Sequence, residues 1–532
     1  MKLYKYLLVL SIAGSAITSC KKATLINLNI DPTTLLTVDP KQQFLQASSH
    51  LPNDFEYYYD VYRSLMPWLQ YSTGGAGNGA GFTNPSSHFN YRYGNFYGNV
   101  GVPLSDIPNL ISKMSAPDQA ARVYENNIAT IYKAYYAFYV SDINGSIPYS
   151  QAFEARYGGT LTPVYDPQQN LFDTLDAQIK AAVAVLETSQ STTQLLYGSF
   201  DPFYAGVATQ WAKAGNALRL KIAMRLMKRD PAKLKSIATE VLADANQMSA
   251  VDDSWVLYVG ASFADANGNY NPSGILASKT VVDFMQSKAD PRLRMFYRTN
   301  SHGAYAGSPS SPDTAKLPSY QALYLSTTDT PFSPLQHRMF TPNYNENDGF
   351  GVGSGDGFFP ILTYAEYCFL RADMGARAIT TDDAGTWYAK GVTASINFYD
   401  ERATKAKVSN YTAVSGAEIS AYLAAPGVVF NSAKATEQIA CQAYLDFYRQ
   451  PSEAWAWWKR TGFPNTTSVL PWSALTSNGT PLVLTRRASL SLAAPGDANY
   501  TNQKAAYDAM AADPGFGTGL GDAFGRVWWD QQ

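Results

Sequence analysis

The sequence predicts a mainly α-helical protein with long irregular loops. Segments with an apolar residue at every third or fourth position follow one another along the chain, whereas segments with strand-like alternation are scarce. Hydrophobic residues make up 46% of the 532 residues, which is enough to bury a large core and argues against intrinsic disorder. No linker divides the chain, so we expect a single domain over residues 51–532.

The N-terminus is predicted to be a lipoprotein signal over residues 1–19. Two lysines precede a short apolar stretch at 7–13, which is too short to span a membrane. An apolar residue, two small residues and then Cys20 resemble a bacterial lipobox. The Cys20 thiol is therefore expected to carry the lipid anchor and to begin the mature chain. The alternative is an ordinary export signal cleaved after Ala16.

Residues 20–50 are expected to form an extended arm, because two Asp-Pro pairs favour turns there. Helices are then predicted from apolar periodicity. The clearest spans 167–187, where the Asp166 side chain can cap the first turn and Pro167 suits the first helical position. The other predicted helices cover residues 53–70, 121–141, 207–228, 231–247, 274–287, 363–379, 385–404 and 434–449.

Two pairs of these segments look like helical hairpins, 167–187 with 207–228 and 363–379 with 385–404. The chain has no clean 34-residue repeat, so periodicity by itself does not establish tetratricopeptide stacking. Basic residues in the second half of segment 207–228 suit the helix dipole, and we expect them to form a solvated face.

Composition and motifs argue against several classes of function. The chain carries 41 Lys+Arg against 43 Asp+Glu, so it lacks the basic excess with which nucleic-acid-binding proteins neutralise phosphates. It has no P-loop, no nucleophile elbow and no HExxH zinc motif, and its three cysteines are too few for a disulfide scaffold. The adjacent aspartates at 252–253 and 382–383 do not suit a glycosidase, because sequence neighbours rarely face one another. We expect no catalytic residue, no metal and no cofactor.

Three long loops are predicted, over residues 72–100, 259–273 and 298–360. Loops of this length are uncommon unless they are functional. The first is rich in glycine, asparagine and aromatic residues. The second contains an Asp-x-Asn-x-Asn motif at 265–269, which imitates the start of a calcium loop but lacks the glycine and the carboxylate of an EF-hand. A calcium site of another kind stays an alternative.

Aromatic residues in the loops are the candidate ligand contacts. A sugar ring can lie flat on an aromatic ring while amides and hydroxyls bond its hydroxyl groups, and peptide ligands would use the same residues. Aromatic residues at helical spacing are expected in the core instead. Trp68 and Tyr71 end a predicted helix at the entry to the first loop, so we expect them at an exposed concave surface with Tyr91 and Tyr93. The full set of predicted ligand-binding residues is Trp68, Tyr71, Phe82, His88, Tyr91, Tyr93, Tyr270, Tyr305 and Tyr320.

Several blocks of the sequence resemble the SusD/RagB-like lipoproteins, and most closely their SusD-like branch. The segment YKAYYAFYVSDINGSIPYSQA at 132–152 is similar to the family's D-x-x-G-x-x-P-Y-x-x-A pattern. Further similar blocks follow in the family's order at 165–186, 211–226, 362–377, 437–464 and 485–490. The chain departs from the pattern at 21–22, where two lysines replace an acidic run that signals surface export. It departs again at 495–497, where Pro-Gly-Asp replaces Pro-x-x-Glu.

The resemblance implies tetratricopeptide-like helix pairs and a lipoprotein of the outer membrane, anchored through Cys20 and exposed at the surface of a Bacteroidetes-type cell. It also implies a partner, a SusC-like TonB-dependent transporter that this protein would cover as a hinged lid. Ligands in the family are mostly glycans and sometimes peptides. We therefore expect non-catalytic capture of an oligosaccharide and its delivery to the transporter. The alternatives are peptide capture by the same scaffold and, from another class, a secreted helical glycosidase.

Overall fold

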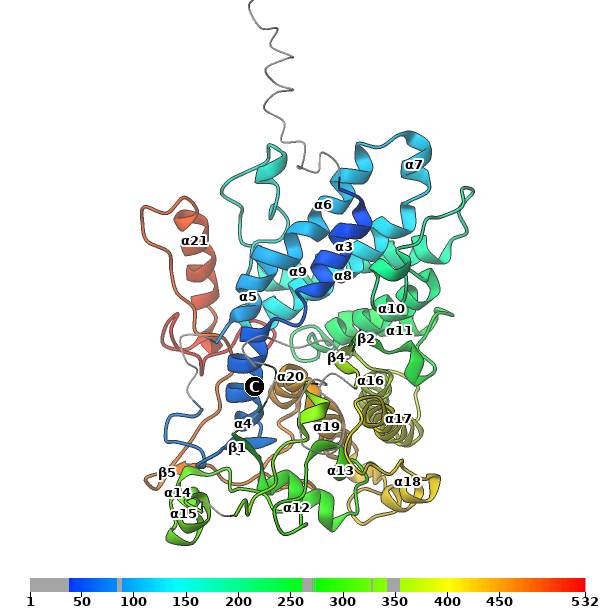
Figure 1. Cartoon of the computed structure of the whole chain (residues 1–532). Helices are drawn as coiled ribbons and strands as arrows, with labels where there is room; N and C mark the ends of the chain where they lie inside the picture. The colour runs from blue at the N-terminus through cyan, green and yellow to red at the C-terminus, as the bar shows by residue number, and fades with distance from the viewer. Residues whose placement is uncertain are drawn as a thin grey trace, which may run out of the picture.

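The described residues of the computed structural model are 38–83, 89–260, 270, 272, 274–326, 329–341 and 355–531. The fold is mainly helical, which confirms the predicted fold class (Figure 1). The predicted signal with Cys20, the ligand candidate His88 and the calcium-like motif at 265–269 lie outside the described residues. Within the described ranges, no helix combines the length and the apolar character needed to cross a membrane.

The first described helix, α3 (Pro40–Ser49), lies where the sequence predicted an extended arm up to residue 50, so this part of the prediction was wrong. The Asp39 carboxylate accepts a hydrogen bond from the backbone N–H of Lys41 at 2.9 Å. Pro40 occupies the first turn, where its fixed φ suits a helix and its missing N–H costs nothing. The Asp-Pro pair that suggested a turn therefore starts a helix.

The predicted helix over 53–70 forms, but most of it is a π-helix. It consists of η1 (Glu56–Leu65), which continues directly into α4 (Met66–Trp68). The hydrogen bonds of η1 span five residues, as between the N–H of Met66 and the carbonyl of Val61. This pattern makes each turn wider than in an α-helix, and such turns are rare and frequently occur at functional sites.

The loop predicted over 72–100 is correct only in its first, glycine-rich part, which follows β1 (Ser72–Gly74). The later part is helical and comprises α5 (Tyr91–Asn95) and the π-turn η2 (Phe96–Val100), which continue into α6 (Gly101–Ser112). The Asp60 carboxylate accepts hydrogen bonds from the backbone N–H groups of Asn90 and Tyr91 at 3.2 and 2.9 Å. A residue some thirty positions earlier thus provides the acceptor at the start of α5, which a local sequence pattern cannot reveal.

Helices pack side by side in the upper part of Figure 1. After α3 and α6 these are α7 (Ala116–Ala120), α8 (Val123–Asn144), α9 (Gln168–Glu187), α10 (Ala208–Met224) and α11 (Pro231–Leu242). Helix α9 packs against both α8 and α10, which confirms the first predicted hairpin. The start of α9 differs from the prediction, because Pro167 is the cap residue. The Asp166 carboxylate instead accepts hydrogen bonds from the N–H groups of Tyr149 and Ser150, at 2.8 Å each.

The second half of the chain adds shorter elements and one long hairpin. Its helices are α12 (Lys279–Ser287), α13 (Leu293–Phe296), α14 (Pro312–Ala315), α15 (Pro318–Tyr324), α16 (Tyr364–Ala376), α17 (Ala384–Lys405), α18 (Gly416–Leu423), α19 (Ala435–Asp446), α20 (Pro451–Thr461) and α21 (Tyr500–Ala511). Helices α16 and α17 pack closely together, which confirms the second predicted hairpin. Short 3-10 turns are η3 (Ala155–Tyr157), η4 (Gly198–Phe200), η5 (Val251–Asp253), η6 (His337–Met339), η7 (Ser432–Lys434), η8 (Phe447–Arg449) and η9 (Pro514–Phe516).

Strands are scarce, as predicted, and in the described residues they form three antiparallel pairs. Two pairs join distant parts of the chain: β1 with β3 (Ile275–Ala277), and β2 (Trp255–Val259) with β4 (Gly357–Leu362). The third is the small hairpin of β5 (Thr476–Ser477) and β6 (Thr480–Pro481). Strand β3 occupies the first part of the segment predicted as a helix over 274–287.

Arg219 and Lys221 of α10 and the following Arg225 lie in the core, so the predicted solvated face was wrong for these three residues, whereas Lys228 is exposed. Lys221 Nζ lies 3.0 Å from Oε1 of Glu366 on α16, and Arg225 Nε lies 2.8 Å from Oδ1 of Asp142 on α8. Both cations also pair with Glu453 on α20, at 3.1 and 2.9 Å. Buried charges need such partners because they lose their hydration. The network therefore ties four helices together, and its carboxylates come from parts of the sequence far from α10.

Candidate functional site

Three of the predicted ligand residues lie in the core, where a ligand cannot reach them. Trp68 and Tyr71 are 1% and 0% exposed, so their predicted place at an exposed surface was wrong; Tyr270, another candidate, is 6% exposed. Tyr71 stacks on Tyr444 with ring centroids 4.3 Å apart and 8° between the planes. Trp68 packs against Trp455 of α20 at 5.8 Å.

Each buried ring has a main-chain acceptor for its polar atom, which explains how it can lie in the core. The indole N–H of Trp68 donates to the carbonyl of Phe82, and the hydroxyl of Tyr71 donates to the carbonyl of Tyr444. The hydroxyl of Tyr270 donates to the carbonyl of Pro52. A tyrosine or tryptophan satisfied in this way buries its large apolar ring without leaving an unpaired donor.

The other described candidates are partly exposed and lie on different elements. Tyr93 packs on Tyr97 at 4.6 Å, while Tyr320 on α15 stacks on Phe332 at 6.3 Å. Tyr305 packs against the edge of the core. Phe82 and Tyr91, by contrast, lie at the two features described next. The binding roles of all these residues stay predictions.

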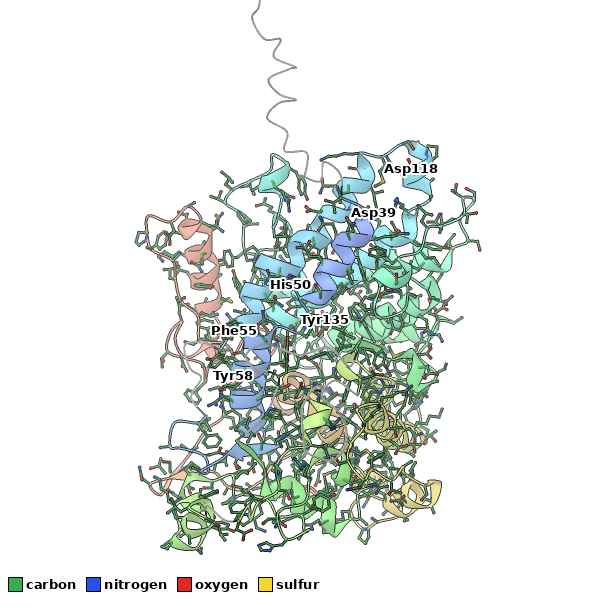
Figure 2. All side chains as sticks on the ribbon, in the orientation of Figure 1. Asp39, His50, Phe55, Tyr58, Asp118 and Tyr135 are labelled. Atoms are coloured by element: carbon green, nitrogen blue, oxygen red, sulfur yellow. The ribbon has the colours of Figure 1, made fainter. Side chains whose placement is uncertain are left out.

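Four rings gather on the surface beside η1, and we call them the aromatic platform: Phe55, Tyr58, Tyr59 and Tyr91. The planes of Phe55 and Tyr59 lie 2° apart, with centroids separated by 6.3 Å. Tyr91 stacks on both of these rings at 5.7 and 5.8 Å. Tyr58 stands at 87° to Tyr59, with centroids 4.8 Å apart. Phe55 is 45% exposed, and Figure 2 shows it with Tyr58 along the η1 ribbon.

The π-helix and a buried carboxylate together position the platform. Wide π-turns bring Phe55 and Tyr59, four residues apart, almost parallel. Asp60 points inward from the same helix and holds the backbone of Tyr91, so the third ring is fixed against the first two. Burial raises the pKa of Asp60 well above its ordinary value, and the neighbouring Glu56 carboxylate raises it further.

The charges beneath the platform are engaged in buried contacts. Glu56 accepts a hydrogen bond from the hydroxyl of Tyr139, and the guanidinium of Arg92 lies 3.8 Å from the centroid of the same ring. Arg92 also donates to the hydroxyl of Ser452 on α20 at 2.9 Å. Glu56 and Asp60 are both buried. The acidic groups of η1 therefore support the surface from below instead of facing a ligand.

Arg63 connects the platform to a groove of about 240 Å³ that we call the glycine groove. Its guanidinium lies 4.6 Å from the centroid of the Tyr58 ring and donates to the Tyr58 hydroxyl at 2.7 Å. The groove is lined by Tyr62, Arg63, Pro67, Thr73, Gly74, Gly75, Gly77, Asn78, Gly79, Phe82, Gly274 and Ile275. Glycines leave its floor open, because a side chain at Gly75 would collide with the carbonyl of Gly274 at 2.8 Å.

The platform and the glycine groove present flat rings, hydroxyls and a guanidinium. These groups bind a neutral polar ligand by stacking and hydrogen bonding. Sequence reasoning found Tyr91 and Phe82 but missed Phe55, Tyr58, Tyr59 and Arg63. Phe55 and Tyr58 fall in the helix predicted over 53–70, and aromatic residues at helical spacing were expected in the core. Periodicity does not tell which end of such a helix other elements cover. Two polar residues just before Phe55, Asn53 and Asp54, were the available sign of a surface position.

A family model described as SusD-like, starch-binding and associating with the outer membrane matches residues 30–484. No curated protein gives a significant match. The match over most of the chain confirms the resemblance seen in the sequence blocks.

Solved structures are similar over nearly the whole chain. A chitin-binding protein is 22% identical with a TM-score of 0.71, and the match covers 93% of this chain and 100% of that one. A SusD homologue from Bacteroides fragilis is 19% identical, with a TM-score of 0.69 and the same coverage. A chitin-binding SusD homologue from Flavobacterium johnsoniae is 21% identical, with a TM-score of 0.66 over 93% of this chain and 98% of that one. At these identities the likeness establishes the fold.

Proposed function

This chain belongs to the SusD-like family of starch-binding proteins that associate with the outer membrane, and from that premise we propose that it captures an oligosaccharide at the aromatic platform without catalysing its breakdown. The capture serves nutrient uptake. Relatives in fold include a chitin-binding protein and a chitin-binding SusD homologue, which supports a glycan as the ligand.

The observation that carries this proposal is the stack of Phe55, Tyr59 and Tyr91. The three planes lie within 25° of one another, and the outermost ring is nearly half exposed. Pyranose rings have apolar C–H faces that pack on such surfaces, much as bases stack on aromatic rings. A stack that is fixed from below loses little conformational entropy when a ligand binds.

The glycine groove would bind the hydroxyl groups of the next sugar unit. Arg63 spans both features, since its guanidinium contacts Tyr58 and lines the groove. The Asn78 side chain faces the groove but donates to the carbonyl of Ser310 at 2.9 Å, so it holds the groove wall in place. The guanidinium of Arg63 then contributes polar atoms toward the ligand.

We further propose that the mature protein is anchored through Cys20 in the outer membrane and delivers its ligand to a SusC-like TonB-dependent transporter. A lid that stays attached while it opens would bury more than about 1,000 Å² against the transporter. Cys20→Ala should release the protein from membranes, and mild-detergent pull-down of the native lipoprotein should recover the barrel.

A direct test measures binding of maltoheptaose and chitohexaose to the soluble mature chain by isothermal titration calorimetry. A Phe55→Ala/Tyr59→Ala variant should lose most of the affinity for the oligosaccharide that binds. Phe524→Ala is the matched control, because Phe524 is 41% exposed on a different surface. Equal binding by both variants would contradict the platform as the site. A peptide array run beside the titration tests peptide capture, and release of reducing ends from either glycan would contradict the non-catalytic role.

A further inference from the structure

A second cleft lies between α6, α8 and α9, on elements that contribute nothing to the platform. Its volume is about 490 Å³, and the segment between Tyr149 and Tyr157 closes one side. The three helices pack side by side in Figure 1. Polar side chains line much of the cleft, among them Asn109, Asn126 and Gln178.

Lys133 of α8 points its ammonium group into this cleft. Its Nζ lies 5.2 Å from the ring centroid of Tyr149 and 5.4 Å from that of Phe153. Among the described residues it has no carboxylate within ion-pair distance, in contrast to Lys221 on α10, which has two. Burial lowers the pKa of Lys133 to about 8, and the Glu154 carboxylate acts in the opposite direction. A half-buried cation that has aromatic neighbours but no carboxylate within ion-pair distance can accept an anion from outside.

Amide groups around Lys133 keep part of their hydrogen-bonding capacity for a ligand. Gln178 accepts from the Tyr149 hydroxyl at 2.6 Å through its carbonyl oxygen, and within the described structure its NH₂ group has no acceptor. Asn127 and Asn109 donate to backbone carbonyls at 2.8 and 3.1 Å, which leaves their side-chain oxygens as acceptors. The cleft thus offers both donors and acceptors at one place.

Phe153 is held in an unusual backbone conformation at the wall of the cleft. Its φ is +68°, in the left-handed region that residues other than glycine rarely adopt. Its ring stacks on Tyr97 at 5.7 Å and packs edge-on against Phe96 at 5.5 Å. Gly101 makes room for it, since a Cβ there would lie 2.2 Å from Phe153 Cζ. Strain of this kind clusters at ligand clamps, because surrounding contacts must maintain it.

We propose that this cleft is a second binding site, which takes a hexuronic acid unit or a similar hydroxylated carboxylate. The carboxylate pairs with Lys133 Nζ, the hydroxyl groups bond the side chains of Gln178, Asn127 and Asn109, and the sugar face lies against Phe153. An ammonium paired with a carboxylate forms a charge-assisted hydrogen bond, which is stronger than a neutral one. This proposal does not depend on the platform, so an experiment can contradict either binding site while the other stands.

The other charges around the cleft favour the same assignment. Arg156 Nη1 lies 2.9 Å from Oδ2 of Asp106 on α6 and pairs with this carboxylate. Arg156 and Lys113, just after α6, both act to lower the pKa of Asp106. Residues of α9 at the cleft are Gln178, Ala181 and Ala182, none of which is charged. Glu154 is the remaining carboxylate, and its charge favours the protonated form of Lys133. Binding of an acid sugar should therefore weaken as the pH rises past about 8 and Lys133 loses its proton.

The test titrates the soluble mature chain with methyl β-D-glucuronide and, in parallel, with the neutral methyl β-D-glucoside. The glucuronide should bind at least about tenfold more tightly than the glucoside, and Lys133→Met should remove that preference. Lys133→Arg should keep part of the preference for the glucuronide over the glucoside. Lys235→Met is the control, because Lys235 is an exposed lysine on α11, which contributes no residue to the cleft.

Three results would overturn the proposal. These are equal affinity for both sugars, unchanged affinity in Lys133→Met, or no binding of glucuronide to a protein whose thermal melting shows it to be folded. The pH profile gives a separate readout that a purely structural role of Lys133 would not produce. Glucuronide affinity should fall between pH 7 and 9 in the wild type and stay flat in Lys133→Met, whose melting temperature reports on the fold independently.

Discussion

The two ends of the segment from Phe55 to Tyr71 carry the same kind of residue in opposite environments. At the first end, Phe55 and Tyr59 stack on the surface with Tyr91. At the other end, Trp68 and Tyr71 are enclosed by helices α19 and α20. Aromatic periodicity runs through both ends without a break, so the pattern itself does not separate a core ring from a binding ring.

The difference comes from what each end meets in space. The buried end pairs with chain almost 400 positions later, where the carbonyl of Tyr444 accepts from Tyr71. The exposed end packs against Tyr91, which Asp60 holds from within the same helix. A ring becomes part of the core when a distant element covers it and supplies an acceptor for its polar atom. Without such cover it remains available to a ligand.

The largest expected effect is at the buried end. Trp68→Ala should lower the free energy of unfolding by about 3–5 kcal/mol, because it leaves a cavity against Trp455 and removes a large buried ring. Phe55→Ala should change it by less than about 0.5 kcal/mol, as is usual at the surface. Urea denaturation of the two variants measures both values. Similar losses in the free energy of unfolding for both variants would contradict the assignment of one end to the core and the other to the surface.

A smaller effect is expected at the link between η1 and α5. Asp60→Ala removes the acceptor of two backbone N–H groups and should cost about 1–3 kcal/mol of stability. It should also weaken oligosaccharide binding, since Tyr91 is no longer held against the other rings. Asp60→Asn keeps an acceptor oxygen and serves as the control. If Asp60→Ala loses stability but binds as the wild type does, Tyr91 is not part of the site.

The smallest expected effect is at the edge of the platform. Arg63→Met removes the hydrogen bond and the cation–π contact with Tyr58 while keeping an unbranched side chain of similar reach. Binding of the oligosaccharide should weaken by about 0.5–1 kcal/mol, the magnitude of an exposed cation–π contact. Calorimetry at two salt concentrations measures the effect. A loss many times larger would place Arg63 at the centre of the site instead of its edge.

Local sequence patterns predicted the fold where helices pack on their neighbours in sequence. The hairpin of α16 and α17 is of this kind, and so is that of α9 and α10. The patterns failed where a distant partner decides the outcome. Asp60 starts α5 from another helix, and Glu366 and Glu453 draw Lys221 into the core, where the carboxylate of Glu366 has its pKa raised to about 8 by burial.

The candidate site was predicted only in part, for the same physical reason. Tyr91 and Phe82 were chosen because they lie in a segment rich in glycine and asparagine, and both do lie at the proposed surface. Trp68 and Tyr71 were chosen because they border that segment, but helices α19 and α20 cover them. Whether a residue is exposed depends on which distant elements pack over it. The spacing of apolar residues along the sequence does not predict those contacts.

The most direct test of the account compares binding and stability in the same three proteins: the wild type, Phe55→Ala/Tyr59→Ala and Trp68→Ala. Each is titrated with the oligosaccharide that the wild type binds and is then unfolded in urea. The account predicts that the double variant loses about 1–3 kcal/mol of binding free energy per ring with its stability intact, while Trp68→Ala loses stability and, once folded, binds normally. A double variant that binds as tightly as the wild type would contradict the claim that the exposed end of this segment is the glycan site.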